Sequence, residues 1–341
     1  MLKHQNKSLL VTGCVGFIGS NFVPYFLDKY EDYHLVNLDL LTYAGDLDNL
    51  NEVQDHPRYR FVQGDICDRE LVMSLFEDHD IQGVIHFAAE SHVDRSIDGP
   101  KQFIETNILG TFNLLECIRE YYDLLDEEKK SGFRFHHIST DEVYGDLSLD
   151  EPSFTELHRY KPSSPYSASK ASSDHLVRAW HRTYGLPIII TNCSNNYGPF
   201  QNNEKLIPTI IGKLLSGKKV PIYGDGNQIR DWLYVNDHAH ALHKVSMEGK
   251  IGETYNIGGN SERTNLEVVK EIWQVLKNNY STDLKINDDF KNCIEYIVDR
   301  PGHDRRYAID SSKILNELGW KPSETFISGF KKTVEWYINY K

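Results

Sequence analysis

Residues 8–19, SLLVTGCVGFIG, begin with a short apolar run and continue into a glycine-rich turn. Residues 17–30 then repeat apolar side chains at helical spacing, and residues 34–38 form a second apolar run that ends at Asp39. A glycine-rich turn in this position is typical of a strand that leads into a helix. We therefore expect a βαβ unit at the start of the chain.

The glycines of this turn, Gly13, Gly16 and Gly19, have G-x-x-G-x-x-G spacing, a variant of the dinucleotide-binding fingerprint. The first two allow the backbone to approach a pyrophosphate, and the third allows the helix to pack closely on the strand. Asp39 ends the second strand, where a carboxylate binds ribose hydroxyls and repels a 2′-phosphate. No arginine flanks Asp39, so the sequence favours NAD over NADP.

Strands and helices continue to alternate as far as Thr191, which predicts an α/β fold with a doubly wound parallel Rossmann sheet. Asp65 and Ile66 follow the third strand, where they line an adenine site or, in the case of Asp65, cap the next helix. The segment 123–132 is charged and is expected to be a solvated loop. The other expected strands are 59–63, 83–88, 133–138 and 187–191, and the expected helices are 68–79, 100–122 and 166–184.

Beyond Asn192 the sequence becomes richer in asparagine and glycine, with expected helices at 206–216, 265–280 and 327–340. We interpret this half as a smaller, partly interleaved α/β substrate-binding lobe. The expected NAD-binding domain comprises residues 1–193, with 232–260 returning to it, and the lobe comprises 194–231 and 261–341.

The net charge of −13 argues against nucleic acid as a partner, because binding phosphates needs an excess of lysine and arginine. Residues 1–13 contain too short an apolar run for a signal peptide, and no run approaches the ~18 residues that span a bilayer. The five cysteines are scattered and form no CxxC motif, which is typical of free thiols in a reducing compartment. We expect a cytoplasmic protein without a membrane partner or disulfides.

Three histidines, His238, His240 and His243, are close enough in sequence to raise the question of a metal site. On a helix capped by Asn236 or Asp237, only the last two histidines share a face. No acidic or cysteine ligand completes the set, so we favour a structural role and expect no metal.

Two stretches carry groups suited to chemistry: Ser139-Thr140-Asp141-Glu142 ends an expected strand, and Tyr166-Ser-Ala-Ser-Lys170 opens an expected helix. Ligands of open parallel sheets bind outside the carboxyl ends of the strands, where these side chains would project. Each stretch also has a structural interpretation, because Thr-Asp-Glu can cap the next segment and a Tyr–Lys pair can lie on a helix surface.

A set of motifs spread over almost the whole chain points to a known family. These motifs are TGCVGFIG, GDICD, FAAESHVDRS, STDEVYGD, YSASK, NCSNNYGP, DGNQIRDWLYV and DRPGHDRRYAID. With them, the chain resembles the extended short-chain dehydrogenase/reductases that act on nucleotide sugars, and within them the dTDP-D-glucose 4,6-dehydratases. Most of the motifs are common to epimerases and decarboxylases, whereas the Thr-Asp-Glu triplet is typical of the dehydratases.

The resemblance implies that Tyr166 removes the proton from the hydroxyl on carbon 4 of the hexose, with Thr140 bonded to the same hydroxyl. Lys170 would lower the phenol pKa and bind the nicotinamide ribose. Glu142 would then take the carbon 5 proton, and protonated Asp141 would donate to the hydroxyl leaving carbon 6. The implied product is dTDP-4-keto-6-deoxy-D-glucose, an intermediate of deoxysugar biosynthesis such as the rhamnose pathway.

The resemblance also implies two sets of binding residues and a homodimer built from the helices near 100–122 and 166–184. The implied NAD-binding residues are Gly13, Gly16, Phe17, Ile18, Gly19, Asp39, Leu40, Leu41, Thr42, Asp65, Ile66, Phe87, Ala88, Ala89, Ser91, Thr106, Tyr166, Lys170 and Asn196. The implied substrate-binding residues are Ser91, Thr140, Asn195, Lys205, Leu206, Pro221, Tyr223, Arg230, Asn265, Arg300 and His303. Without the family, Arg230 is as well interpreted as a salt-bridge partner of Asp231, and Tyr223 as a turn residue.

One departure is Cys14-Val15, where the family usually has Gly-Ala. A β-branched valine resists positive φ, so we expect this turn to be less favourable for cofactor binding.

Three alternatives remain. An epimerase needs neither Asp141 nor Glu142, a dehydratase for another nucleotide sugar has the same groups, and a catalytically silent NAD-binding regulator needs no Thr140, Tyr166 and Lys170.

Overall fold

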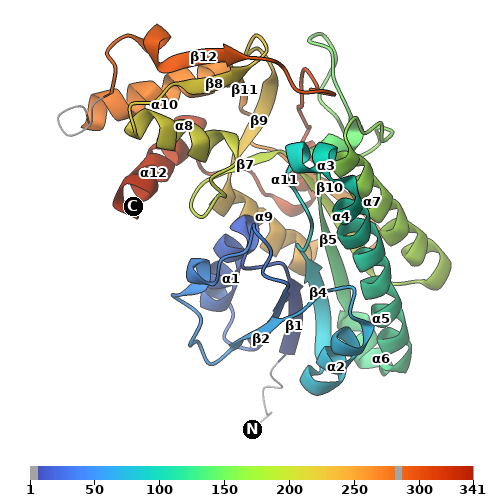
Figure 1. Ribbon diagram of the computed structural model, residues 1–341. Coiled ribbons are helices and arrows are strands. Elements are labelled where there is room, and N and C mark those ends of the chain that lie inside the picture. Colours follow the sequence, from blue (N-terminus) through green and yellow to red (C-terminus); the bar gives the residue numbers. More distant parts are fainter. Residues whose placement is uncertain (1–6, 281–285, 341) are drawn as a thin grey trace.

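The computed structural model describes residues 7–280 and 286–340. Figure 1 shows a parallel sheet in its lower part and a smaller lobe at the upper left. The sheet has seven strands in the order β10-β6-β5-β4-β1-β2-β3, and all of its pairings are parallel. The strands are β1 (Lys7–Thr12), β2 (Tyr33–Asp39), β3 (Tyr59–Gln63), β4 (Ile81–His86), β5 (Arg134–Thr140), β6 (Ile188–Cys193) and β10 (Thr254–Ile257).

The strand order reverses between β1 and β4. From β1 the chain adds β2 and β3 on one side and then returns to place β4, β5 and β6 on the other. This arrangement confirms the predicted doubly wound Rossmann sheet. The loops after β1 and β4 diverge at the reversal, which is where open α/β sheets bind ligands.

Helices cover both faces of the sheet because alternate side chains of each strand point to opposite faces. Leu9 and Val11 pack into the apolar cluster under α1 (Phe17–Lys29), α9 (Val235–Glu248) and α11 (Ser312–Leu318). Leu10 packs on the other face, under α2 (Arg69–His79), α5 (Thr111–Leu124) and α7 (Pro165–Tyr184). The remaining helical segments here are η1 (Leu47–Leu50), α3 (Val93–Asp98), α4 (Pro100–Phe103), η2 (Ile104–Gly110) and α6 (Glu127–Gly132).

The smaller lobe has its own apolar core around Tyr197, Ile210, Ile272 and Phe330. It contains a three-stranded sheet of β7 (Asn195–Tyr197), β9 (Ile229–Tyr234) and β11 (Glu262–Thr264), and a two-stranded sheet of β8 (Val220–Tyr223) and β12 (Ile294–Ile297). Its helices are α8 (Leu206–Leu215), η4 (Phe290–Cys293), α10 (Asn265–Tyr280) and α12 (Phe326–Asn339).

Two of the predicted helical boundaries are corrected by the structure. The segment expected to be a solvated loop contains α6, because the Asp126 side chain accepts a hydrogen bond from the Lys129 amide at 2.9 Å and caps this helix. The helix expected at 100–122 contains the π-helical segment η2 between α4 and α5.

The predicted start of α9 is also wrong. This helix begins at Val235 after Tyr234, so neither Asn236 nor Asp237 caps it. The Asp237 carboxylate instead accepts hydrogen bonds from Ser323 and from the Glu324 amide.

Among the described residues, no helix combines the length and the apolar character needed to cross a bilayer. All five cysteines are free thiols.

Candidate active site

The glycine turn lies at the reversal in strand order. Gly13 has φ of +75°, and a Cβ on it would lie 2.5 Å from the Ala88 Cα, in the loop after β4. Any side chain at position 13 would therefore push the two loops apart. Gly19 faces Cys14 so closely that a Cβ there would also clash, which explains the third glycine of the motif.

Asp39 lies at the end of β2 and orders the glycine turn. Its carboxylate accepts hydrogen bonds from the Val15 amide at 3.1 Å and from the Leu41 amide at 2.9 Å. Burial raises the pKa of Asp39, and these two amides lower it. The backbone reason for expecting weaker cofactor binding at Val15 does not hold, because positive φ occurs at Gly13 and, beyond the turn, at Leu41, but not at Val15.

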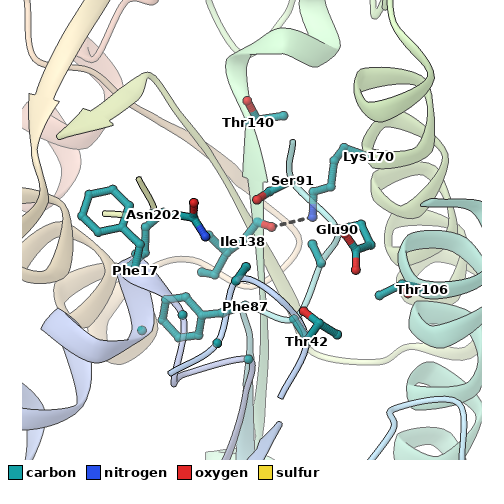
Figure 2. A pocket seen from close by; sticks show the side chains of 18 of the residues that line it. Phe17, Thr42, Phe87, Glu90, Ser91, Thr106, Ile138, Thr140, Lys170 and Asn202 are labelled. Atoms are coloured by element: carbon teal, nitrogen blue, oxygen red, sulfur yellow. Dashed lines mark hydrogen bonds between the residues drawn. The ribbon is translucent and has the colours of Figure 1, made fainter. Parts of the chain in front are cut away.

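A single pocket extends from the glycine turn to the ends of β5 and β6, and it contains most of the residues predicted to bind NAD (Figure 2). Leu41 is the exception, because it packs against the apolar cluster under α1. The predicted residues that line the pocket are Gly13, Gly16, Phe17, Ile18, Gly19, Asp39, Leu40, Thr42, Asp65, Ile66, Phe87, Ala88, Ala89, Ser91, Thr106, Thr140, Asp141, Glu142, Tyr166, Lys170, Asn195, Asn196 and Lys205.

Asp65 does not cap the helix that follows it. Its carboxylate accepts a hydrogen bond from the Cys67 amide at 2.8 Å, whereas Asp68 caps α2. The structure therefore rules out the helix-cap interpretation of Asp65, which lines the pocket instead.

Several residues that the sequence did not single out also line the pocket. Glu90 is adjacent to predicted site residues, so its position in a quoted motif was the available signal. Cys193 lies at the end of β6, and Gln201 and Asn202 carried no separate signal, because their place depends on how the lobe packs over the sheet.

The Thr140-Asp141-Glu142 triplet combines both of its interpretations. Thr140 is the last residue of β5, and its hydroxyl accepts a hydrogen bond from the Glu142 amide at 3.3 Å, which caps η3 (Asp141–Tyr144). Asp141 is only 1% exposed. Burial and the neighbouring Glu142 charge raise the pKa of Asp141 well above its usual range, which favours the protonated form of this carboxyl.

Glu142 is only partly buried and faces a different environment. Burial raises the pKa of this carboxyl, but the cations of Arg300, Arg230 and Lys205 lower it. The two adjacent carboxyls therefore differ in surroundings: Asp141 is enclosed and only the Arg230 cation lowers its pKa, whereas three cations lower that of Glu142. Such a difference separates an acid from a base.

Tyr166 and Lys170 lie in the first two turns of α7, which begins with a capping box at Ser164. Burial raises the pKa of the Tyr166 phenol, the Glu142 charge raises it further, and the Thr140 hydroxyl lowers it. Lys170 donates a hydrogen bond to the Ile138 carbonyl at 2.8 Å (Figure 2). The predicted lowering of the phenol pKa by Lys170 stays a prediction.

The lobe supplies Arg230, whose alternative interpretation as a partner of Asp231 is wrong. Asp231 accepts hydrogen bonds from the Gly259 and Ser261 amides. Arg230 instead lies over the Tyr307 ring at 4.3 Å and donates to the carbonyls of Ile229 and Asp304.

The other predicted substrate residues lie in the lobe or bridge to it. Lys205 donates to the Ser91 carbonyl at 2.8 Å, and Arg300 forms an ion pair with Asp94. The ring of His303 packs edge-on against Tyr223, the last residue of β8. The helix α8 begins at Leu206, and α10 begins at Asn265. Pro221 lies in β8.

The three clustered histidines are packed among other side chains of the protein. His238 is fully buried, His240 packs on Tyr25, and His243 contacts the Tyr30 hydroxyl at 2.8 Å. Within residues 7–280 and 286–340, no group of three or more His, Cys, Asp or Glu side chains has the geometry of a metal site.

The pocket suits a polar, elongated cofactor such as NAD. At one end, the glycine turn exposes backbone at the reversal in strand order. Elsewhere in the lining, amide oxygens of Asn195, Asn196 and Gln201 are buried without a hydrogen-bond partner among the described residues. Buried acceptors of this kind are suited to ligand donors.

Comparison with known proteins gives a consistent result over nearly the full chain. The family model described as GDP-mannose 4,6 dehydratase matches residues 10–333. The dTDP-glucose 4,6-dehydratase of Salmonella typhimurium is 58% identical over 338 residues, which cover 97% of this chain and 92% of the relative.

Two solved structures are similar in both sequence and fold. The dTDP-glucose 4,6-dehydratase of Bacillus anthracis in complex with NAD is 46% identical, with a TM-score of 0.86 and coverage of 98% of this chain and 97% of that one. DesIV, the dTDP-glucose 4,6-dehydratase of Streptomyces venezuelae with NAD and TYD bound, is 44% identical, with a TM-score of 0.87 and 97% coverage of each chain. The chain belongs to the GDP-mannose 4,6 dehydratase family.

Proposed function

We propose that this protein is an NAD-dependent hydro-lyase that converts dTDP-D-glucose into dTDP-4-keto-6-deoxy-D-glucose and water. The observation that carries the proposal is the pair of adjacent carboxyls, Asp141 and Glu142, in the pocket that also contains Tyr166 and Lys170. A 4-epimerase requires the second pair alone. The names of the relatives described above support the substrate.

The proposed roles follow from the surroundings of each side chain. Tyr166, next to Thr140, accepts the proton of the carbon 4 hydroxyl as that carbon is oxidised to a ketone. The ketone acidifies the hydrogen on carbon 5, which Glu142 removes. Asp141, protonated because it is enclosed, gives its proton to the carbon 6 hydroxyl, which leaves as water.

The residues around the glycine turn, together with Asp39, Thr106, Lys170 and Asn196, would hold NAD. Bound NAD would supply the acceptor for the hydride from carbon 4 and the donor of that hydride to carbon 6. Glu142 returns a proton to carbon 5 at the end of the cycle, so the sugar loses one water and the cofactor is regenerated.

The lobe is proposed to hold the nucleotide. Arg230 and Arg300 are donors suited to a diphosphate, and Tyr223 has a ring suited to stacking on a pyrimidine. Arg230 is 6% exposed and is fixed by carbonyl groups and the Tyr307 ring. The substrate would then reach from the lobe toward Thr140.

We further propose the division into an NAD-binding domain of residues 1–193 with 232–260 and a lobe of 194–231 and 261–341. β10 pairs with β6 in the large sheet, which supports assigning that segment to the domain. A homodimer through the α4–α5 and α7 helices is supported by exposed apolar side chains at Ile104, Leu109 and Phe112. We propose a cytoplasmic location, where the nucleotide sugar is available.

An isotope experiment tests the reaction. Incubation with dTDP-glucose in deuterated water should give a product with deuterium on carbon 5. A hydrogen isotope bound to carbon 4 of the substrate should appear bound to carbon 6. A galactose epimer, or unchanged sugar recovered after incubation with NAD, would refute the proposal. Parallel incubation with UDP-glucose and GDP-mannose reports the nucleotide preference.

A further inference from the structure

The fully buried Asp174 has no part in the proposed chemistry, yet it lies directly behind the site. It follows Lys170 by one helical turn on α7, as Lys170 follows Tyr166. Its carboxylate accepts hydrogen bonds from the Ser139 hydroxyl at 2.9 Å and the Tyr160 hydroxyl at 2.8 Å. The His137 ring lies 3.2 Å from its other oxygen.

Asp174 remains ionised although it is buried. Burial alone would raise its pKa, but His137, Lys170 and Arg178 together lower it below the usual range. A buried carboxylate needs such partners, because an isolated buried charge is costly.

Asp174 is the anion that acts on Lys170 through space: it lies one turn further along α7, and the ammonium itself is bonded to the Ile138 carbonyl. Burial lowers the pKa of Lys170, and the Asp174 carboxylate raises it. The surrounding titratable groups are Tyr166 on α7, His137 on β5, His86 on β4, Cys193 on β6 and Glu90 in the loop after β4.

None of those other groups balances the ammonium at neutral pH. Burial lowers the pKa of His137 to about 4 and that of His86 further, so both rings are neutral. Burial raises the pKa of Cys193 to about 12, which keeps it a thiol. Glu90 interacts with Tyr43 and Arg95 rather than with Lys170.

The same carboxylate ties α7 to the end of β5. Ile138 accepts a hydrogen bond from Lys170, and the next residue, Ser139, donates to Asp174. The Thr140 carbonyl is held in turn by Asn192 at 2.9 Å. Two successive residues of the strand are thus fixed to the helix immediately before Thr140.

We propose that Asp174 is a positioning residue for the oxidation step, in which it supplies the counter-charge of the Lys170 ammonium and anchors the strand end that carries Thr140. It acts through Lys170 and Ser139 without touching the substrate. This inference rests on the proposed roles of Tyr166 and Lys170.

The test separates the charge of Asp174 from its hydrogen bonds. Asp174→Asn removes the charge but keeps an acceptor oxygen, Ser139→Ala removes one bond but keeps the charge, and Asp28→Asn on the exposed side of α1 is the matched control. The measured quantities are the rate at which dTDP-glucose reduces bound NAD, its pH profile, KM and Tm.

Asp174→Asn should slow NAD reduction by about tenfold or more at neutral pH, with KM changed less than about twofold. The alkaline limb of its pH–rate profile, where the rate of NAD reduction falls as the pH rises, should move to lower pH by about one unit. The reason is that the Lys170 ammonium loses its proton more readily without a counter-charge. Ser139→Ala should slow reduction without moving the limb, and Asp28→Asn should match the wild type.

Two results would overturn the proposal. One is an Asp174→Asn variant that keeps the wild-type rate and pH profile, and the other is equal losses in Asp174→Asn and Ser139→Ala with no displaced limb, which would indicate a purely structural anchor.

A double-mutant cycle in Tm needs no substrate, so it tests the Lys170–Asp174 coupling even if the wild type fails to turn over dTDP-glucose. Lys170→Met leaves the buried Asp174 anion without one of the cations that stabilise it, and the double variant Lys170→Met/Asp174→Asn should regain Tm relative to the less stable single variant. The double variant should regain stability even if Asp174→Asn alone does not fold. Additive losses in the double variant would refute the coupling.

Discussion

Replacing Glu142 with glutamine should uncouple oxidation of the sugar from loss of water. The substitution keeps the size of the side chain and removes the group that takes the carbon 5 proton. It also removes a negative charge that raises the pKa of both Tyr166 and Asp141. Phenolate formation at Tyr166 is thereby favoured, so the structure predicts that oxidation at carbon 4 is not slowed.

The elimination should be strongly impaired. Loss of a general base slows a proton transfer by about 100- to 10,000-fold, which corresponds to about 3–5 kcal/mol in the barrier. The lowered pKa of Asp141 adds to this effect, because more of that carboxyl is ionised and unable to donate its proton. Oxidation that is retained and elimination that is blocked lead to accumulation of the reduced cofactor.

Rapid mixing of the enzyme with dTDP-glucose measures both the oxidation at carbon 4 and the elimination of water. The near-ultraviolet absorbance of the reduced nicotinamide should rise and persist in Glu142→Gln, whereas in the wild type it should rise and decay within one turnover. Glu77→Gln, an exposed residue on α2, is the matched control and should behave as the wild type. Normal turnover by Glu142→Gln would refute the assignment of Glu142 as the base, and absence of any NAD reduction would refute the charge argument for Tyr166.

Two further substitutions test how the site is built. Gly13→Ala should release NAD and lower the free energy of unfolding by about 1–3 kcal/mol, because positive φ is unfavourable for alanine and its Cβ would lie 2.5 Å from Ala88. The control is Gly132→Ala, where a Cβ has no atom within 4 Å, and this variant should retain NAD as the wild type does. Equal NAD retention by both variants would contradict the close approach of the loops. Asp39→Ala should reduce the preference for NAD over NADP by about tenfold or more, because the carboxylate that repels a 2′-phosphate is lost. The dissociation constants of NAD and NADP measure this preference. An unchanged ratio of the two constants would show that Asp39 serves only to order the turn.

Much of the fold was predictable from the sequence because it depends on local patterns. The apolar run before Gly13 and the helical repeat after it predict a strand and a helix wherever they occur in a chain, and the alternation of such units leaves few topologies open. The start of α9 and the presence of α6 were missed because Asp126 and Asp237 are equally suitable caps by sequence, yet Asp126 caps a helix while Asp237 accepts from Glu324. The difference depends on a segment that is distant along the chain.

The sequence by itself determined which groups the protein has for chemistry: the glycine turn, Asp39, the Thr140-Asp141-Glu142 triplet and the Tyr166–Lys170 pair. Spacing fixes their places at the ends of strands and the start of a helix, since those places depend on neighbouring residues. The tertiary structure alone decided how the two carboxyls differ. Asp141 is enclosed by the sheet and the lobe, whereas Glu142 faces Arg230 and Arg300, which are far away in sequence. A pKa depends on burial and on charges through space, so this difference appears only when the lobe is packed over the sheet.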